Sequence, residues 1–536
     1  MIQDLSNFSN LKKYKQMKSK YSTLSIVSVS LLLAGVLTGA ITGCQKLTED
    51  PKAALTPSSY FKTQSDLDAS IAGMYIQLAR DGAWGFTSKE TSYFGSDDLT
   101  TDPGLNKGDQ REFDELAGSS TNPSLPAEWN GPWQTIYNAN YIIANYGKVN
   151  STDALKKASA GQAYFIRGLC YYYLVRTFGP LPLVTVPLDV TVRPPRSPVD
   201  SIYTQIISDL QTAKTMLGTA KVQGKPNTYS ASAILTDVYL TMAGWPLKDA
   251  TKYQSAATEA QIVMSSNVYD VNTPYDQVFT TRNSSESIFA LQYSVAGNLP
   301  NRRFGSSNVP LDEVGLDGSS GWDDVYPEIN FYKKRPICSR SFLTFYDTLK
   351  LRQADKVTFI LTPWNSPVTH AMHPYYKKFR AGLKTNGVGD GVNETATQII
   401  TIQPSTNEET IISRYPGVLL DYAEASAMAA NGPSAASYTA INQVRLRAGL
   451  PNLTPGLSAT AFRDSVVYER AYEFAEEFGV RWFDIVRLQL LPQIAAGRDP
   501  SENPISGGTN FAQKYWAPIP LAEMTLNPAW KQNDGY

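Results

Sequence analysis

Histidine and cysteine are scarce in this chain of 536 residues. The ones present are His370 and His373, and Cys44, Cys170 and Cys338. With so few histidines a Ser-His-Asp arrangement is improbable, and no G-x-S-x-G motif is present. The two histidines form an H-x-x-H pair that lacks the central Glu of metalloproteases and runs directly into Pro374. We therefore expect neither a metal centre at this pair nor a cofactor, and we leave a structural calcium ion open, since no feature of the sequence indicates one.

Charge and long apolar runs are also limited. Charged residues make up 18% of the chain and the net charge is −1, so the composition does not favour binding to nucleic acid. No apolar run after residue 41 is long enough to span a membrane. Cys170 and Cys338 lack C-x-x-C spacing, and we expect two unpaired, buried thiols. A hydrophobic fraction of 42%, with 31 Tyr and 9 Trp, instead indicates a folded protein with a large core.

The first 43 residues have the pattern of an export signal. Five lysines between residues 12 and 20 precede an apolar stretch over 24–41 and small residues over 39–43. The segment AITGC at 40–44 resembles a bacterial lipobox, although lipoboxes more often have Leu where Ile41 stands. The resemblance implies that Cys44 is lipidated and becomes the mature N-terminus, with residues 44–60 as a polar tether. The alternative is an uncleaved signal anchor, for which the apolar stretch is short.

Helical periodicity dominates both ends of the remaining chain. We predict helices over 129–146, 153–178, 199–217, 230–243 and 249–266, after a first helix that starts near Asp66. Further helices are predicted over 414–430, 434–448 and 459–478. Short Pro, Gly or Asn linkers join neighbouring helices, which favours TPR-like hairpins, although no strict 34-residue repeat is present.

The segment between these two helical groups has a different composition. Residues 268–410 are rich in Gly, Pro, Ser and Asn and predict loops, with one strand over 286–294. The sequence therefore predicts a mainly α fold that forms a single domain over 61–536. In this fold a helical scaffold, made of 61–267 and 411–490, supports an irregular, loop-rich region, and loops of this length are usually functional. A Pro-rich tail over 491–536 follows.

Carboxylates beside aromatic rings in loops are the residues that we expect to bind a ligand. Sugars offer both hydroxyls and flat C–H faces, so carboxylates and exposed rings suit them. The candidates are Trp84, Tyr93, Asp97, Asp98, Trp322, Asp323, Tyr326 and Trp364. Paired carboxylates are also the catalytic groups of glycosidases, so a surface glycoside hydrolase stays an alternative. A third cluster, Glu473, Glu476 and Glu477, lies on a predicted helix where pairing with Arg470 and Arg481 favours a structural role.

Four motifs, in this order, resemble those of the SusD/RagB family of outer-membrane lipoproteins of the Bacteroidota. They are QAYFIRGLCYYYLVRTFGPLPLV at 162–184, ISRYPGVLLDYAEASAMA at 412–429, YERAYEFAEEFGVRWFDIVRL at 468–488 and YWAPIPLAEMTLNPAWKQNDGY at 515–536. Two positions depart from the family pattern. Pro416 suits the first turn of a helix that begins there, and Phe478 stands between Glu477 and Gly479, where the family usually has Glu-Gly.

The resemblance implies a SusD-like fold, lipid-anchored at the outer membrane and facing the cell exterior. It implies that the protein sits as a lid over a SusC-like TonB-dependent transporter and presents captured oligosaccharide for import, without catalysis. Some members bind peptides, so a RagB-like peptide-binding uptake lipoprotein is a further alternative. Because the ligand-contacting positions vary across the family, the motifs do not identify them in this chain.

Overall fold

The computed structural model describes residues 60–536, apart from residues 190, 297–299, 301–304 and 381–391. The predicted signal peptide, Cys44 and the tether as far as residue 59 lie outside this part of the chain. The described residues belong to one compact unit, in which helices predominate and the strands form short two-stranded sheets. Among these residues, no helix combines the length and the apolar character needed to cross a membrane.

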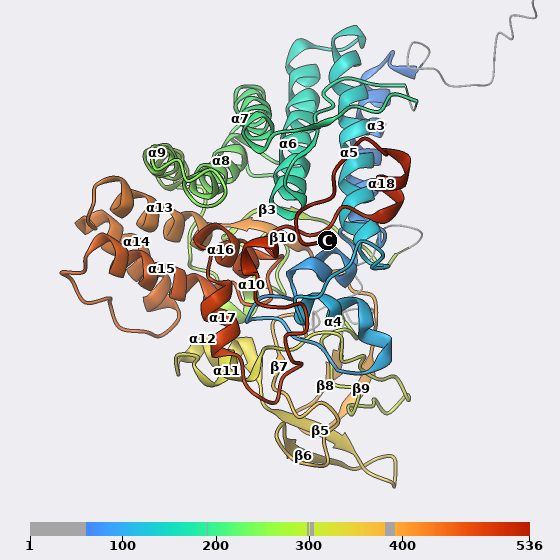
Figure 1. The fold of residues 1–536 in the computed structure, drawn as a ribbon, viewed down its shortest axis with the longest axis vertical. Coiled ribbons are helices and arrows are strands. Elements are labelled where there is room, and N and C mark those ends of the chain that lie inside the picture. The colour runs from blue at the N-terminus through green and yellow to red at the C-terminus, as the bar shows by residue number, and fades with distance from the viewer. Residues whose placement is uncertain (1–59, 190, 297–299, 301–304, 381–391) are drawn as a thin grey trace, which may run out of the picture. The chain divides into compact units, whose positions relative to one another are not determined.

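Six long helices form the first half of the scaffold, and each packs against the next one in chain order (Figure 1). They are α3 (Gln64–Ala79), α5 (Leu125–Asn145), α6 (Asp153–Phe178), α7 (Val199–Met216), α8 (Thr228–Ala243) and α9 (Lys252–Met264). Short elements connect the first of them, namely η1 (Thr87–Tyr93), η2 (Leu105–Lys107), α4 (Gly108–Asp114) and η3 (Tyr146–Lys148). This arrangement confirms the predicted succession of helical hairpins.

Helix α6 is the centre of this half, and its bounds are those predicted from the periodicity. The side chains of its second half are almost all buried, including Cys170, which is unpaired as expected. The buried Tyr171 hydroxyl donates to the carbonyl of Val184 at 2.9 Å, which fixes the chain after the helix. The helix ends at Gly179, whose φ of +71° is readily adopted only by glycine.

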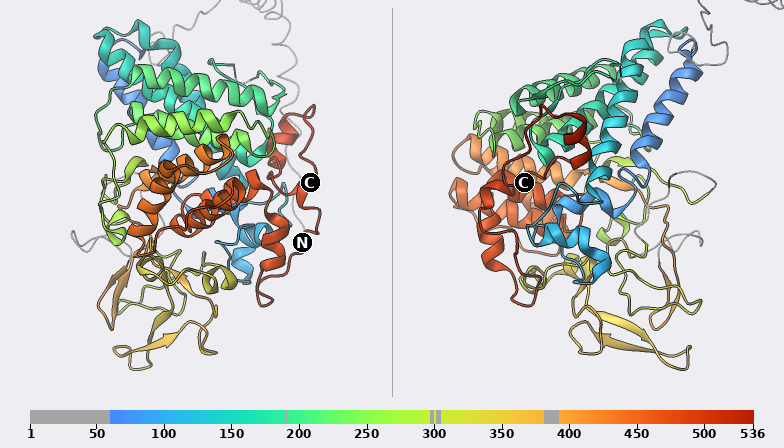
Figure 2. Two further views of the ribbon diagram at one scale, coloured as in Figure 1. Left: turned by 90° about the vertical axis from the view of Figure 1, so that its left-hand side faces the viewer. Right: turned by 45° about the vertical axis from the view of Figure 1, so that its right-hand side comes forward.

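The second half of the scaffold comes from the other end of the chain. It contains α13 (Tyr415–Ala429), α14 (Ala435–Arg447), α15 (Ala459–Glu473), α16 (Val480–Leu488) and α17 (Leu491–Gly497), followed by η4 (Phe511–Gln513) and α18 (Leu521–Leu526). Helix α13 packs against α8 and α9 of the first half and against α14 and α15 of its own. One scaffold is therefore assembled from both ends of the chain, as predicted, and both views of Figure 2 show the two groups next to each other.

In its described residues, the loop-rich region between the halves contains only short elements. They are α10 (Tyr275–Val278), β3 (Ser287–Leu291), α11 (Ile329–Lys333), α12 (Ser339–Thr344), β4 (Phe345–Tyr346), β5 (Thr348–Arg352), β6 (Phe359–Pro363), β7 (Tyr375–Tyr376), β8 (Val392–Glu394), β9 (Ile399–Ile402) and β10 (Thr410–Arg414). The predicted strand over 286–294 is confirmed as β3, which is buried and pairs with β10 in antiparallel register. The remaining antiparallel pairs are β4 with β7, β5 with β6, β8 with β9, and β1 (Leu181–Pro182) with β2 (Arg196–Ser197).

The end of α15 differs from the prediction. The helix stops at Glu473 instead of continuing to 478, because Glu476 and Phe478 have positive φ values of 66° and 33°. Cations from other elements satisfy the carbonyl groups left at this end. Arg414 donates to the Glu473 carbonyl at 2.7 Å, and Lys378 Nζ donates to the same carbonyl and to that of Ala475, both at 2.9 Å.

The acidic cluster at the end of this helix is structural, but its ion-pair partners are not the predicted ones. Glu473 pairs with Arg340 at 3.0 Å and with Arg414 at 2.5 Å, while Glu477 pairs with Arg414 at 2.8 Å. Arg470 instead contacts Asp421 and, at 2.8 Å, Asp484. The prediction that Arg470 serves the cluster is therefore wrong, because the cations that pair with the cluster come from other elements, such as Arg340 of α12 and Arg414 of β10.

Candidate functional site

Trp84 and Tyr93 lie in the core. The Trp84 side chain is 2% exposed, and its ring centroid lies 4.8 Å from those of both Tyr173 and Phe478. Tyr93 packs edge-on against Phe483 at 5.0 Å, and its hydroxyl lies 3.2 Å from that of Thr177. Neither ring has a face open to a ligand in this conformation, contrary to the expectation of an exposed platform. The contacts assign both to packing between α6 and the segments around α16.

The first aspartate pair anchors a loop to the scaffold. Asp97 accepts two hydrogen bonds from Arg481, at 2.6 and 2.7 Å. Asp98 is 3% exposed and accepts the Ser96 hydroxyl at 2.6 Å and the Glu476 N–H at 3.0 Å. Burial raises the pKa of Asp98 to about 6. Arg481 was expected to pair with the glutamate cluster of 473–477, and the structure corrects this assignment.

The second aspartate pair is buried as well. Asp323 is 2% exposed and accepts the Leu311 N–H at 2.8 Å and the Tyr375 hydroxyl at 2.9 Å, while burial raises its pKa. Its second oxygen lies 3.2 Å from Nδ1 of His370. Asp324 pairs with Lys107 of η2. These carboxylates therefore have protein partners already, which argues against their serving as open acceptors for sugar hydroxyls.

Tyr326 and His373 pack against each other. Tyr326 is fully buried, and its ring packs on the imidazole of His373 with centroids 4.4 Å apart. Nε2 of His373 contacts both carboxylate oxygens of Glu502 at 3.1 Å. The two histidines of the H-x-x-H pair thus face different partners.

Trp322 and Trp364 are the predicted rings that stay partly exposed. The ring of Trp322 meets that of Phe86, which is also partly exposed, at a centroid distance of 6.4 Å and an angle of 77°. The Trp322 backbone N–H donates to Ser306 and Val309, so the loop holds the ring in place. Trp364 follows β6 and packs edge-on against Tyr332 at 5.9 Å. We call Phe86 and Trp322 together the Trp322 surface.

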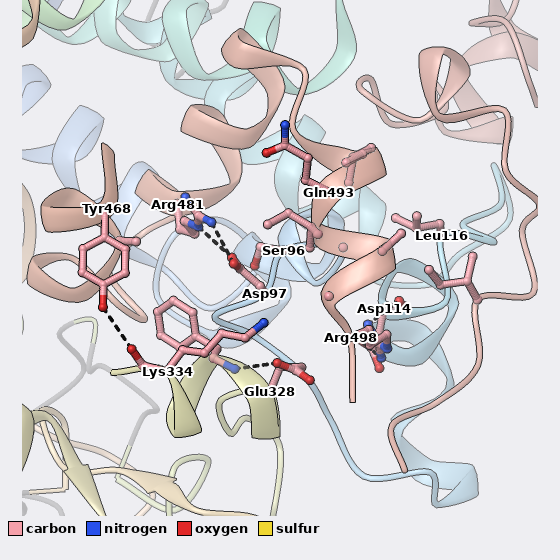
Figure 3. Close-up of a pocket in the computed structure, with 18 of the residues that line it drawn as sticks. Ser96, Asp97, Asp114, Leu116, Glu328, Lys334, Tyr468, Arg481, Gln493 and Arg498 are labelled. Carbon is pink, nitrogen blue, oxygen red and sulfur yellow. Dashed lines mark hydrogen bonds and ion pairs between the residues drawn. The ribbon is translucent and has the colours of Figure 1, made fainter. Parts of the chain in front are cut away.

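A small pocket lies between α11, α15, α17 and the loop that carries Asp97 (Figure 3). Two ion pairs form part of its wall, Asp97 with Arg481 and Asp114 with Arg498 at 2.7 Å. The Tyr468 hydroxyl donates to the carbonyl of Lys334 at 3.0 Å across one side. Its volume of about 190 Å³ is below the roughly 300–1,000 Å³ usual for drug-sized ligands. It is therefore too small to enclose an oligosaccharide.

A larger cavity of about 630 Å³ lies beside α3. Its polar lining includes Tyr75, Gln162, Gln223 and Gln292, groups that suit sugar hydroxyls. These side chains are largely occupied with one another. The Tyr75 hydroxyl donates to Gln162 at 3.1 Å, and Gln223 donates to Gln292 at 2.7 Å. The sequence offered no signal for this cavity, since its residues come from α3, α6 and two loops and share no motif.

Comparisons with known proteins agree with this fold. A family model described as "SusD family" matches residues 369–536, and one described as "Starch-binding associating with outer membrane" matches residues 47–240. SusD-like protein P2 of Formosa agariphila is 28% identical over 94% of this chain and 98% of its own length.

Solved structures give the same result. A SusD homolog from Bacteroides thetaiotaomicron has a TM-score of 0.75 at 22% identity, covering 89% of this chain and 98% of that one. A laminarin-binding SusD-like protein has a TM-score of 0.70 at 22% identity, covering 89% of this chain and all of that one. The two family models match different parts of the chain, one toward each end, and together they cover more than half of it. The chain belongs to the SusD-like family.

Proposed function

We propose that this protein binds an oligosaccharide at the outer membrane and passes it on without hydrolysing it. Three comparisons support carbohydrate as the ligand class: the starch-binding description of one matching family model, the laminarin-binding neighbour and the SusD-like relatives. The observation that carries the proposal within this chain is the Trp322 surface, where two partly exposed rings meet nearly at right angles. Such rings can cover the flat C–H face of a sugar and one of its edges.

The two cavities fit the ligand less well than the Trp322 surface. The pocket in Figure 3 is too small for more than a single sugar ring. In the larger cavity, Gln292 also donates to Glu409 at 2.8 Å, so a sugar would have to break existing hydrogen bonds to gain new ones. A sugar that stacks on the Trp322 ring would not compete for the backbone N–H of this residue, which donates to Ser306 and Val309.

The aspartate pairs give little support to the hydrolase alternative. A glycosidase needs two carboxyl groups that flank the scissile bond and are reachable by it. Asp97 is held by Arg481 and Asp324 by Lys107, while Asp98 and Asp323 are 3% and 2% exposed. A raised pKa, as at Asp98, suits a general acid only where the substrate can reach the group.

The proposed function also includes a lipid anchor and a transporter partner. We infer that lipidated Cys44 tethers the protein to the outer membrane, facing the cell exterior, and that a SusC-like TonB-dependent transporter receives the glycan. Acyl chains stabilise attachment by about 0.8 kcal/mol per buried CH₂, so lipidation suffices as an anchor. Cys44→Ala should abolish incorporation of labelled palmitate and release the processed protein from membranes. Processed protein that stays membrane-bound without Cys44 would contradict this inference.

The binding test uses the purified full-length protein with a panel of laminarin- and malto-oligosaccharides. Calorimetry should detect binding of at least one series, and mass spectrometry of the same mixtures should show no shortened product. Products that disappear with Asp97→Asn or Asp323→Asn would establish the hydrolase instead. Binding of peptides in place of every oligosaccharide would favour the RagB-like alternative.

A further inference from the structure

Two buried aspartates and an exposed imidazole converge at one point of the loop-rich region. Nδ1 of His370 lies 3.1 Å from a carboxylate oxygen of Asp102 and 3.2 Å from one of Asp323. The three atoms all lie within 4.8 Å of one another. The carboxylates are 7% and 2% exposed at the side chain, whereas the imidazole is 49% exposed. The three residues are 47 or more positions apart in the chain, so no sequence motif predicts the cluster.

From this geometry we propose that Asp102, Asp323 and His370 bind a divalent transition-metal ion of the Zn²⁺ class. Ligand atoms that sit about 2.0–2.2 Å from such an ion are roughly 3.0–3.5 Å from one another in tetrahedral or octahedral arrangements. The two nitrogen-to-oxygen distances lie in this range. An imidazole among the ligands favours Zn²⁺ over Ca²⁺ or Mg²⁺, which are bound through oxygen. Three protein ligands would leave a further position for a water molecule.

The surrounding hydrogen bonds hold these atoms as a metal site requires. In each aspartate the other oxygen is already engaged, in Asp102 by the Gly104 N–H and in Asp323 by Leu311 and Tyr375. The His370 backbone N–H donates to Asp312 at 2.6 Å, which fixes the position of the imidazole. Outer partners of this kind orient metal ligands, and removing them typically weakens metal binding by about 10–100-fold.

A buried hydroxyl supplies an independent indication of a ligand. Tyr326 is fully buried, and among the described residues its hydroxyl has no hydrogen-bond partner. Its ring lies edge-on to that of Tyr375 at a centroid distance of 5.7 Å, and the Tyr375 hydroxyl donates to Asp323, so the buried ring is next to the cluster. A buried hydroxyl without a hydrogen-bond partner destabilises the fold. A water molecule bound to the metal would give it a partner.

The test measures metal binding directly and needs no oligosaccharide. The full-length protein, carrying no histidine tag, is stripped with a chelator and dialysed against Zn²⁺. The wild type should retain one Zn²⁺ per chain, and Co²⁺ in its place should give visible absorption bands that Zn²⁺ displaces. His370→Ala should weaken Zn²⁺ binding by about tenfold or more. The exposed imidazole makes this variant safe for folding, and its unchanged circular dichroism would verify that.

Three variants make the result specific. Asp102→Asn should also lose the ion, whereas Asp189→Asn, which removes an exposed carboxylate elsewhere, should bind like the wild type. His373→Gln should retain the ion, because His373 faces Glu502. The proposal is overturned if the wild type binds no Zn²⁺ at micromolar concentration, or if His370→Ala binds it as tightly as the wild type. It is equally overturned if only Ca²⁺ binds.

Discussion

Trp84 and Trp322 show how differently two tryptophans in glycine-containing loops can be used. Trp84 fills a space between Tyr173 and Phe478, whereas Trp322 is partly exposed beside Phe86. We expect Trp84→Ala to lower the free energy of unfolding by about 3–5 kcal/mol, the usual cost of removing a buried aromatic ring. Trp322→Ala should cost less than about 1.5 kcal/mol, and denaturant unfolding of both variants measures the difference. Equal losses would contradict the burial assigned to Trp84.

Asp98 should make stability depend on pH. Its pKa is raised to about 6 by burial, so the folded state holds the proton that the unfolded state releases near pH 4. This contribution to stability is present below pH 4 and falls by about 3 kcal/mol as the pH rises to 7. Asn has no proton to lose. The stability of Asp98→Asn relative to wild type should therefore increase between pH 4 and pH 7.

Unfolding of both proteins at several pH values checks this sign. Asp189→Asn serves as the control, because Asp189 is exposed and its pKa is lowered by hydrogen bonds from Thr191. Its stability relative to wild type should not rise over the same interval. If Asp98→Asn became less stable relative to wild type as the pH rises to 7, the raised pKa of Asp98 would be contradicted.

Local sequence could identify these residues as candidates but not separate them by role. The stretches RDGAWGFTS and SSGWDDVYP both indicate a tryptophan in a loop. What buries Trp84 is Tyr173 and Phe478, which lie far away in the chain. Asp97 and Asp98 likewise depend on Arg481 and on the backbone of Glu476. Such partners are brought together by the tertiary fold, so they could not be predicted from the local sequence.

At the scale of elements, a buried ion network joins the loop-rich region to the second half of the scaffold. Arg414, at the end of β10, pairs with Glu286 before β3 at 3.2 Å and with Glu473 and Glu477 at the end of α15. Arg447 of α14 contacts Glu286 and Glu473 as well. Burial opposes ionisation, but the guanidinium groups of Arg447, Arg414 and Arg340 hold the pKa of Glu473 well below its usual range.

Truncating Arg414 should be costly because its partners would remain charged and buried. We expect Arg414→Met to lower the free energy of unfolding by about 3–5 kcal/mol. Arg463→Met is the matched control, since Arg463 pairs at the surface with Asp464, which is 63% exposed, and such pairs contribute about 0–1 kcal/mol. Chemical denaturation at pH 7 compares the two. A loss at Arg414 no larger than at Arg463 would show that the network is not a stabilising junction.

The helices themselves could be predicted because their apolar spacing is local. The bounds of α6 and α7, and those of α13, follow the periodicity to within about two residues. The end of α15 could not be predicted in this way. It depends on the positive φ of Glu476 and on carbonyl groups that Arg414 and Lys378 satisfy from outside the helix.

At the scale of the whole molecule, the scaffold fixes where a ligand can bind. Two packed groups of helices from opposite ends of the chain hold the loop-rich region, whose β5–β6 hairpin stands away from α5 and α6 in Figure 2. The class of the fold and this division could be predicted from four motifs and from composition. Which residues of the loop region are exposed could not be predicted, because their exposure depends on how the loops pack on one another.

We propose that this SusD-like protein binds oligosaccharide at the Trp322 surface. Titration calorimetry of the full-length protein with its best-binding oligosaccharide tests it most directly. Trp322→Ala should weaken binding by about tenfold or more, equivalent to about 1.4 kcal/mol, with stability nearly unchanged. Trp364→Ala, which alters a partly exposed ring packed on Tyr332, should bind within about twofold of the wild type. Unchanged affinity in Trp322→Ala would contradict the account.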